Sequence, residues 1–441
     1  SQAMLSALAF AMVATFMTLI MTKRLSAMVA LIVVPSVFAL AGGFATGLGS
    51  MMLDGVRQLA PTGVMLLFAI LYFGIMIDAG LFDPMIVRIV AIVGNDPLRV
   101  LVGTAVLALM VSLDGDGTTT YMITVAAMLP LYRHLQLDVR KMACVIIMAA
   151  AVTNLLPWGG PAARAASALQ IDSASLFIPM LPAMLAGAIW VLVVAAYFGI
   201  RERRRLAARV TAVDDELTRG SLVEEDRARD SEALRPRRFI PNLLLTLGLM
   251  AMLLTGALPL PVLFMLAFAV ALMLNYPSLA EQKQRIDAHA GNALAVVGMI
   301  FAAGIFMGIL SGTGMVNAMA ASVLGLVPPA LGPYMAPITA LLSIPFTFLI
   351  SNDAFYFGML PVLAQTAAAY GIEPEAVARA SLVGQQVHLL SPLVPSTYLL
   401  VGLAQIEFGE HQRFTLPWAL GACAVMLVSA ILFGAFPLFA G

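Results

Sequence analysis

Charged residues are scarce in this chain of 441 residues. Asp, Glu, Lys and Arg together make up 11% of it, against about 25% in an average soluble domain. That shortage excludes an ordinary water-soluble domain. The formal net charge is zero, so the charge balance gives no indication of a nucleic-acid partner.

Cysteine is almost missing as well. The only two cysteines, Cys144 and Cys423, both lie inside apolar runs. No disulfide framework and no cysteine metal site follows from such a pair. The sequence also lacks the His-Glu-x-x-His zinc motif of many hydrolases.

Apolar residues, by contrast, make up 61% of the chain, where about 45 to 50% is usual. Many apolar segments approach the roughly 20 residues that an α-helix needs to cross a bilayer. We therefore expect an all-α polytopic membrane protein. The plain spans are expected at about 4–21, 25–45, 62–82, 176–199, 239–257, 261–276, 292–311 and 415–438, with a polar linker over 201–238.

One segment, at about 98–132, is interrupted by two carboxylates and two glycines. They are Asp114, Gly115, Asp116 and Gly117, followed by Thr118 and Thr119. An Asp at the centre of a bilayer costs roughly 2.5 to 3.5 kcal/mol, so it marks a functional site by default. Non-helical backbone is tolerated at that depth only where it is buried in protein or lines a wet cavity. The pattern predicts the apex of a re-entrant hairpin that faces a polar binding site.

The next segment, about 139–171, is a helix broken in its middle. Its break contains Asn154, Pro157, Gly159 and Gly160, and prolines remove amide donors from a helix. A helix that stops and restarts presents free amides at one end and free carbonyls at the other. The break can therefore hold an anion and a cation side by side.

The same order returns after the linker, with a hairpin expected at about 333–370 and a broken helix at about 375–405. The two halves align without gaps here. Asp116-Gly117-Thr118 falls on Ser351-Asn352-Asp353, Tyr121 on Tyr356, and Pro157 on Pro392. Each repeat, 4–200 and 239–441, then has five crossings and one hairpin. Because five is odd, the second repeat is inverted relative to the first, which is a transporter architecture.

Basic residues indicate the orientation. Most Lys and Arg residues, including those of the 201–238 linker, fall in loops on one predicted face, and loops of that kind are cytoplasmic. Both termini are then expected outside the cytoplasm, the first hairpin opening inward and the second outward. The predicted location is the bacterial cytoplasmic membrane.

Polar residues at membrane depth are the candidate site. Beyond the six residues of the first apex and the four of the first break, they are Arg164, Ser351, Asn352, Asp353, His388, Ser391, Pro392, Ser396 and Thr397. Each also has a structural interpretation. Ser and Thr can bond their own helix backbone, Asn154 can cap a freed helix end, His388 can be a satisfied interior histidine, and Arg164 can reach toward the exterior or face an anionic substrate. Of these candidates, the three acids at the matched apices are the ones for which a functional role is predicted most strongly.

Several motifs resemble those of the metal-citrate:proton symporter family (CitMHS) of the ion transporter superfamily. The resemblance covers nearly the whole chain outside the linker. It rests on Met21-Thr22-Lys23-Arg24-Leu25-Ser26, Phe73-Gly74-Ile75-Met76-Ile77-Asp78, Leu113 through Thr124, and Pro157-Trp158-Gly159-Gly160-Pro161 with Arg164 through Leu169.

The resemblance implies import of citrate chelated to a divalent cation such as Mg²⁺ or Ca²⁺, together with protons. It also implies a homodimer in which a transport domain slides like an elevator against a scaffold domain. Related sodium symporters carry Ser-Asn-Thr at both apices. The acids that stand here favour protons or a multivalent cation instead, with Asp114, Asp116 and Asp353 near the metal, and Asp116, Asp353 and His388 as proton carriers.

Other functions remain open from the sequence. A sodium-coupled di- or tricarboxylate transporter of the same superfamily is the nearest alternative. An intramembrane aspartyl protease also needs two carboxylates at membrane depth, but its Gly-x-Gly-Asp order differs from Asp-Gly-Asp-Gly, and it has no use for a repeat. A channel can select cations with an acidic ring, but two hairpins suit an occluded site better. A transporter, not an enzyme, is the prediction.

Overall fold

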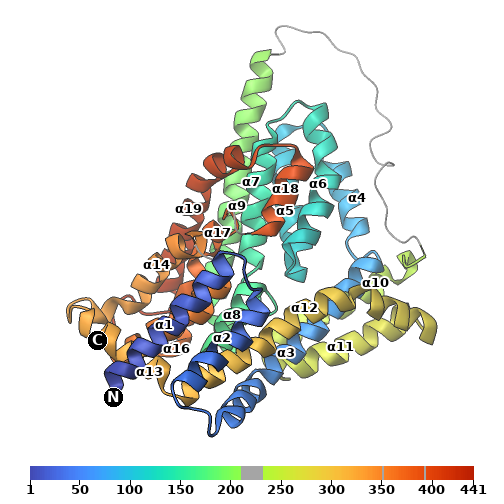
Figure 1. The fold of residues 1–441 in the computed structure, drawn as a ribbon. Coiled ribbons are helices and arrows are strands. Elements are labelled where there is room, and N and C mark those ends of the chain that lie inside the picture. The colour runs from blue at the N-terminus through green and yellow to red at the C-terminus, as the bar shows by residue number, and fades with distance from the viewer. Residues whose placement is uncertain (210–231, 350–351, 392–393) are drawn as a thin grey trace.

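The computed structural model describes residues 1–209, 232–349, 352–391 and 394–441, and in these ranges it contains helices and no strand (Figure 1). Within them, six helices are long and apolar enough to cross a membrane. The expected all-α polytopic class is therefore confirmed. The six are Leu48–Asp78, Pro97–Asp114, Ser173–Arg209, Pro236–Thr255, Leu279–Gly312 and Phe408–Leu432.

In the first part of the chain, the hairpin and the broken helix begin and end close to the predicted residues. The predicted hairpin is α5 and α6 joined by a short 3-10 turn, and the predicted broken helix is α7 and α8. In order, the elements are α1 (Gln2–Met21), α2 (Ala27–Ala41), α3 (Leu48–Asp78), α4 (Asp83–Val93), α5 (Pro97–Val111), η1 (Ser112–Asp114), α6 (Gly117–His134), α7 (Val139–Thr153), α8 (Gly160–Leu169) and α9 (Ser173–Arg209).

The second part repeats this order of long, short and broken helices. Its hairpin is α14 with η4 and α15, and its broken helix is α16 and α17 followed by α18. The elements are η2 (Pro236–Arg238), α10 (Phe239–Thr255), α11 (Leu260–Asn275), α12 (Leu279–Gly312), α13 (Met315–Leu326), η3 (Gly332–Tyr334), α14 (Met335–Leu349), the π-helical η4 (Ala354–Met359), α15 (Leu360–Ala368), α16 (Pro374–Ser381), η5 (Leu382–Gly384), α17 (Gln385–His388), α18 (Pro395–Ala404) and α19 (Phe408–Leu432).

The matched helices α3 and α12 pack against each other more extensively than any other pair. Glycines allow this close approach, because a Cβ on Gly55 would lie 1.9 Å from the carbonyl oxygen of Gly304 and 2.8 Å from the Cα of Gly308. Each helix also packs against an early helix of the other part, α3 against α11 and α12 against α2. Matched elements thus exchange roles between the two parts.

Some predicted boundaries were wrong. The helix α3 begins at Leu48 rather than near 62, and α12 begins at Leu279 rather than near 292. Two short helices, α4 and α13, were not predicted. Both follow a long helix directly, after a turn at Gly80 or Gly314, whose φ angles of +84° and +77° favour glycine.

The predicted start of the linker at residue 201 was also wrong, because α9 continues to Arg209. Glu202, on this extension, is only 1% exposed. Its carboxylate binds Lys141 at 2.5 Å and Arg205 at 2.6 Å. Because the Lys141 bond fixes the extension to the start of α7, residues 201–209 belong to the folded body. Residues 210–231 of the predicted linker lie outside the described part.

A further ion pair joins α9 to the first hairpin near its entrance. Asp96 caps α5 by accepting from the Leu98 amide at 3.2 Å, and it also binds the guanidinium of Arg203 at 2.6 Å. The hydrogen bond from Arg203 holds the pKa of the Asp96 carboxyl below its usual range. The pair lies at the surface, where such contacts contribute little to stability.

Candidate functional site

The first hairpin apex is a tight turn built by its own carboxylates. Asp114 Oδ1 accepts from the backbone amide of Asp116 at 2.8 Å, and Gly115 between them has a φ of +78°. Asp116 then caps α6. Its Oδ1 accepts from the Thr118 amide at 3.0 Å and its Oδ2 from the Thr119 hydroxyl at 2.9 Å. The predicted apex residues are therefore brought together as one capped helix start.

The first helix break holds this apex in place. Trp158 Nε1 donates to the carbonyl oxygen of Leu113 at 2.8 Å, and the Thr153 hydroxyl bonds the Ser112 hydroxyl at 2.5 Å. Trp158 also stacks on Phe73 with ring centroids 5.5 Å apart. At Gly159 a Cβ would lie 2.0 Å from the Asn154 carbonyl oxygen. Only glycine fits there, which explains the predicted break.

The second apex is held by amides instead of carboxylates. Asn352 and Gln385 exchange two hydrogen bonds of 3.1 Å each. Gln385 Nε2 also donates to the Tyr356 hydroxyl at 3.2 Å, and that hydroxyl donates to the Ser381 carbonyl oxygen at 3.1 Å. This network is buried and connects the second hairpin to α16 and α17.

At the second break the polar side chains bond backbone carbonyls. His388 Nδ1 lies 2.6 Å from the Thr347 carbonyl oxygen, and because a carbonyl only accepts, this nitrogen carries a proton. The Ser391 hydroxyl donates to Phe348 at 2.7 Å, and the Thr397 hydroxyl donates to the Leu389 carbonyl. His388 is thus a hydrogen-bonded interior histidine, and its role as a proton carrier stays a prediction.

One ion pair connects the two halves at the site. Arg164 Nε, on α8, lies 2.7 Å from Asp353 Oδ1 at the second apex. Both side chains are mostly buried, 20% and 16% exposed. Arg164 therefore does not reach toward the exterior; its charge points into the protein, beside the hairpin. The sequence neighbours of either residue do not predict this pairing, because the two residues are 189 positions apart in the chain.

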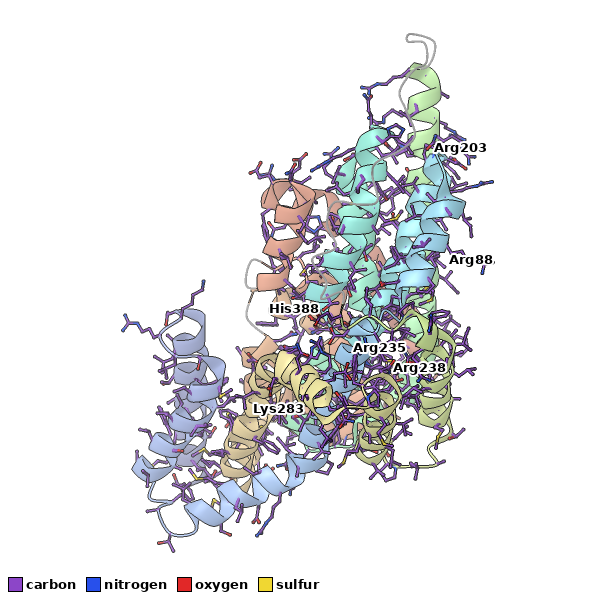
Figure 2. The ribbon with its side chains drawn as sticks, turned by 90° about the vertical axis from the view of Figure 1, so that its right-hand side faces the viewer. Arg88, Arg203, Arg235, Arg238, Lys283 and His388 are labelled. Atoms are coloured by element: carbon purple, nitrogen blue, oxygen red, sulfur yellow. The ribbon has the colours of Figure 1, made fainter. Side chains whose placement is uncertain are left out.

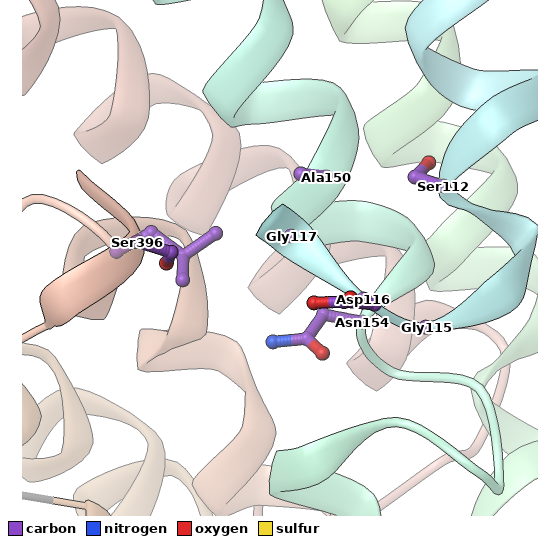
Figure 3. A pocket seen from close by; sticks show the side chains of 8 residues that line it. Ser112, Gly115, Asp116, Gly117, Ala150, Asn154 and Ser396 are labelled. Carbon is purple, nitrogen blue, oxygen red and sulfur yellow. The ribbon is translucent and has the colours of Figure 1, made fainter. Parts of the chain in front are cut away.

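A cavity of about 90 Å³ lies between the first apex, the first break and the second broken helix (Figure 3). Ser396 faces Asp116 and Asn154 across it. The volume is below the roughly 300 to 1,000 Å³ of typical small-molecule pockets, so a larger ligand requires the lining to move. The lining residues are Ser112, Gly115, Asp116, Gly117, Ala150, Asn154, Leu389 and Ser396.

Asp114, Thr118 and Thr119 bond to Asp116 just behind this cavity lining, and Asp353 is not among the lining residues. Asp353 is with Arg164, and in the described ranges no group of three or more His, Cys, Asp or Glu residues is placed to hold a metal ion. Asp114, Asp116 and Asp353 therefore do not form one three-carboxylate centre. Ser351 and Pro392 lie outside the described residues.

Sequence reasoning missed Gln385 and Ala150. Gln385 is fully buried in the second half's network, and Ala150 lines the cavity of the first. The ungapped alignment that places Tyr121 on Tyr356 also places Ala150 on Gln385. The sequence feature that could have identified both residues is a glutamine inside a predicted membrane helix, matched by an alanine in the other half.

Comparison with known proteins identifies the family. The citrate transporter family, CitMHS, matches residues 16–384. The chain belongs to this family. A citrate transporter of Bacillus subtilis is 58% identical over 98% of this chain and 99% of its own length, and the Mg²⁺/citrate complex secondary transporter of the same organism is 50% identical over the same shares. These relatives are transporters, so the prediction of a CitMHS transporter rather than an enzyme is confirmed.

Solved structures show the same fold at low sequence identity. The YdaH transporter of Alcanivorax borkumensis aligns over 91% of each chain with a TM-score of 0.56 and 15% identity. MtrF of Neisseria gonorrhoeae aligns over 90% of this CitMHS chain and 85% of its own, with a TM-score of 0.60 and 14% identity. At these identities the likeness concerns the fold alone.

Proposed function

We propose that this CitMHS transporter imports citrate as a complex with a divalent metal ion of the Mg²⁺ or Ca²⁺ type, in symport with protons. The 50% identical relative named for a Mg²⁺/citrate complex supports the metal–citrate substrate. Mg²⁺ and Ca²⁺ prefer oxygen ligands, and citrate supplies carboxylate and hydroxyl oxygens itself. The protein then needs few ligands of its own, in agreement with the dispersed acids of the described residues.

The free-energy cost of moving negative charge into the cell explains why the metal and the protons are needed. Moving one negative charge inward against 100 mV costs about 2.3 kcal/mol, so free trivalent citrate costs roughly 7 kcal/mol. A divalent ion in the complex reduces this to about a third. Symported protons offset the remainder.

The single observation that carries the proposal is the Arg164–Asp353 pair. A citrate carboxylate has the charge and shape of the Asp353 carboxylate, so the two compete for the same guanidinium. A proton on Asp353 removes that competition and leaves Arg164 free to bind the substrate. Proton binding and citrate binding then favour each other, so the carrier loads both together, as a symporter does. Asp116 is the second candidate carrier, at the cavity itself.

The architecture is part of the same proposal. Residues 4–209 and 239–441 form inverted repeats about a cytoplasmic linker, in a homodimer of the bacterial cytoplasmic membrane with both termini outside. The scaffold comprises α1–α3 and α10–α13, and the moving domain comprises the hairpins, the broken helices, α9 and α19. The reciprocal packing of α6 with α18 and of α8 with α15 supports this, because matched elements exchange partners.

The positions of basic residues support an elevator. Arg203, Arg235, Arg238 and Lys283 all belong to the predicted cytoplasmic face. In Figure 2, Arg203 on α9 nevertheless lies well above the other three, which flank α10 or begin α12. A moving domain displaced toward the cytoplasm relative to its scaffold accounts for this offset.

Binding measured by calorimetry on the purified protein tests the substrate. We expect heat from citrate with excess Mg²⁺, and little from citrate in chelator or from Mg²⁺ alone. Equal binding of citrate with and without the metal would contradict the metal–citrate substrate and favour a carboxylate carrier of another kind.

A further inference from the structure

We propose that Tyr121 contacts the substrate, donating its hydroxyl hydrogen to a carboxylate oxygen of the bound metal–citrate complex in the space that Ala150 leaves open. This inference rests on the proposed function. It assigns a ligand contact and a basis for specificity to two residues of the first half.

The matched tyrosines of the two halves have different surroundings. Both Tyr121 and Tyr356 are fully buried. The Tyr356 hydroxyl is bonded to Gln385 and Ser381, whereas the Tyr121 hydroxyl has no hydrogen-bond partner among the described residues. Buried hydroxyls are rarely left unpaired, so this exception needs an explanation.

The missing partner is the counterpart of Gln385. In the second half, the Gln385 side chain reaches the Tyr356 hydroxyl from α17. In the first half the matched position is Ala150 on α7, which lines the cavity. The position from which an amide reaches one tyrosine therefore holds only a small side chain, at the edge of the cavity, in the other half. A carboxylate has nearly the shape of that amide, and its oxygens accept where the tyrosine donates.

The hydroxyl lies beside the cavity lining. A Cβ on Gly117 would lie 3.5 Å from the Tyr121 oxygen and 3.6 Å from the Ser396 hydroxyl oxygen, and Gly117 and Ser396 both line the cavity. Ser396 is close to the tyrosine but not in hydrogen-bonding geometry with it. A modest movement of α18 relative to the first apex therefore exposes the tyrosine hydroxyl to the cavity.

The charges of the cavity select the ligand. Asp116 brings one negative charge to the lining, and both of its oxygens already accept from the start of α6. A free carboxylate is repelled there, but a chelated one carries a cation that can face Asp116. The metal end of the complex then lies toward Asp116, and a citrate oxygen lies toward Tyr121 and the Asn154 amide. Free citrate is disfavoured at the same place.

Two tyrosine variants test the contact as a matched pair. Tyr121→Phe removes a hydroxyl that has no hydrogen-bond partner among the described residues, so it should leave the unfolding midpoint unchanged and raise the Kd for Mg²⁺–citrate about tenfold or more. Tyr356→Phe removes a bonded hydroxyl, so it should lower the unfolding midpoint and leave the Kd nearly unchanged. Calorimetry with Mg²⁺–citrate and thermal unfolding in detergent measure both quantities.

A second pair tests the open space. Ala150→Gln rebuilds the amide–tyrosine contact of the second half, so it should abolish Mg²⁺–citrate binding while the protein keeps or gains stability. Gln385→Ala in the other half removes its hydrogen bonds to Asn352 and Tyr356, so it should lower the unfolding midpoint. Binding by Ala150→Gln as tight as that of the wild type would overturn the proposal.

The remaining outcomes distinguish this inference from the proposed function. If the wild type binds Mg²⁺–citrate and Tyr121→Phe binds it equally well, the tyrosine contact is wrong and the function stands. If Tyr121→Phe unfolds as early as Tyr356→Phe, its hydroxyl is structural and the contact is again wrong. If the wild type binds no Mg²⁺–citrate, both fall.

Discussion

Arg164 and Asp353 are 189 residues apart in the chain and pair at 2.7 Å. The pair joins the helix that restarts after the first break to the apex of the second hairpin. A charge on either side chain is costly in this mostly buried place unless the other charge compensates it. The contact is therefore both a clamp between the halves and a site where a substrate carboxylate can enter.

Removing one partner should be worse for stability than removing both. Arg164→Gln or Asp353→Asn alone leaves a partly buried charge unpaired, and loss of one partner of a buried pair costs about 3 to 5 kcal/mol. The double variant should recover much of that stability. Chemical unfolding of the four proteins in detergent gives the coupling free energy. Strictly additive losses would show that the two charges do not interact.

Uptake measurements should separate citrate binding by Arg164 from proton binding by Asp353. The double variant should fold but not transport, since it has neither the guanidinium for citrate nor the carboxyl for a proton. Asp353→Asn mimics the protonated acid, so it should retain citrate exchange between equal pools while losing uptake driven by a pH gradient. Gradient-driven uptake by Asp353→Asn at the wild-type rate would exclude this acid as a proton carrier.

Asp116→Asn should abolish uptake without unfolding the protein. Asn is as good a helix cap as Asp, so the change should cost at most about 1 kcal/mol of stability, while the charge beside the cavity is lost. Asp96→Asn is the control, because Asp96 caps α5 in the same manner, away from the cavity. Uptake of radiolabelled citrate into proteoliposomes measures both. An Asp116→Asn protein with normal uptake would make this acid structural only.

Gly74 and His289 should show strong coupling. A Cβ on Gly74 would lie 2.7 Å from His289 Nδ1, and the other ring nitrogen binds Asp78 at 2.7 Å. Gly74→Ala should therefore displace the imidazole and cost about 1 to 3 kcal/mol, and it should cost little in a His289→Ala background. Gly248→Ala is the control, since α10 has open space there. Equal costs of Gly74→Ala in both backgrounds would contradict the packing.

Labelling from outside the membrane tests the orientation. Arg237 and Glu373 are both exposed, so a cysteine introduced at either position can react. The native Cys144 and Cys423 are buried and should not react. In right-side-out vesicles an impermeant thiol reagent should label Glu373→Cys and not Arg237→Cys. Labelling of both positions would rule out the inverted arrangement.

Local chemistry made the hairpins and breaks predictable. Asp, Gly and Pro between apolar runs specify where a membrane helix stops, and α6, α7, α8 and α18 begin or end within a few residues of the expected places. The long helices were less predictable, because α3 and α12 continue into polar sequence that hydropathy assigns to loops. Arg285 is an example, buried on α12 next to Asp78.

The candidate site was predictable only in part. The acids and the Asn-Pro-Gly break were found because they are unusual at membrane depth. The Arg164–Asp353 pair was not, because it depends on how two distant hairpin and helix ends meet. Ala150 carries no signal alone. Its meaning comes from the buried network that Gln385 makes at the matched position.

Proton movement during citrate uptake tests the central claim most directly. Proteoliposomes containing the wild type and an internal pH dye, without sodium on either side, receive Mg²⁺–citrate from outside. We predict that the interior acidifies as labelled citrate enters, that chelator stops both signals, and that an inward proton gradient accelerates them. Citrate entry without acidification, entry that persists in chelator, or entry only with sodium would contradict this account.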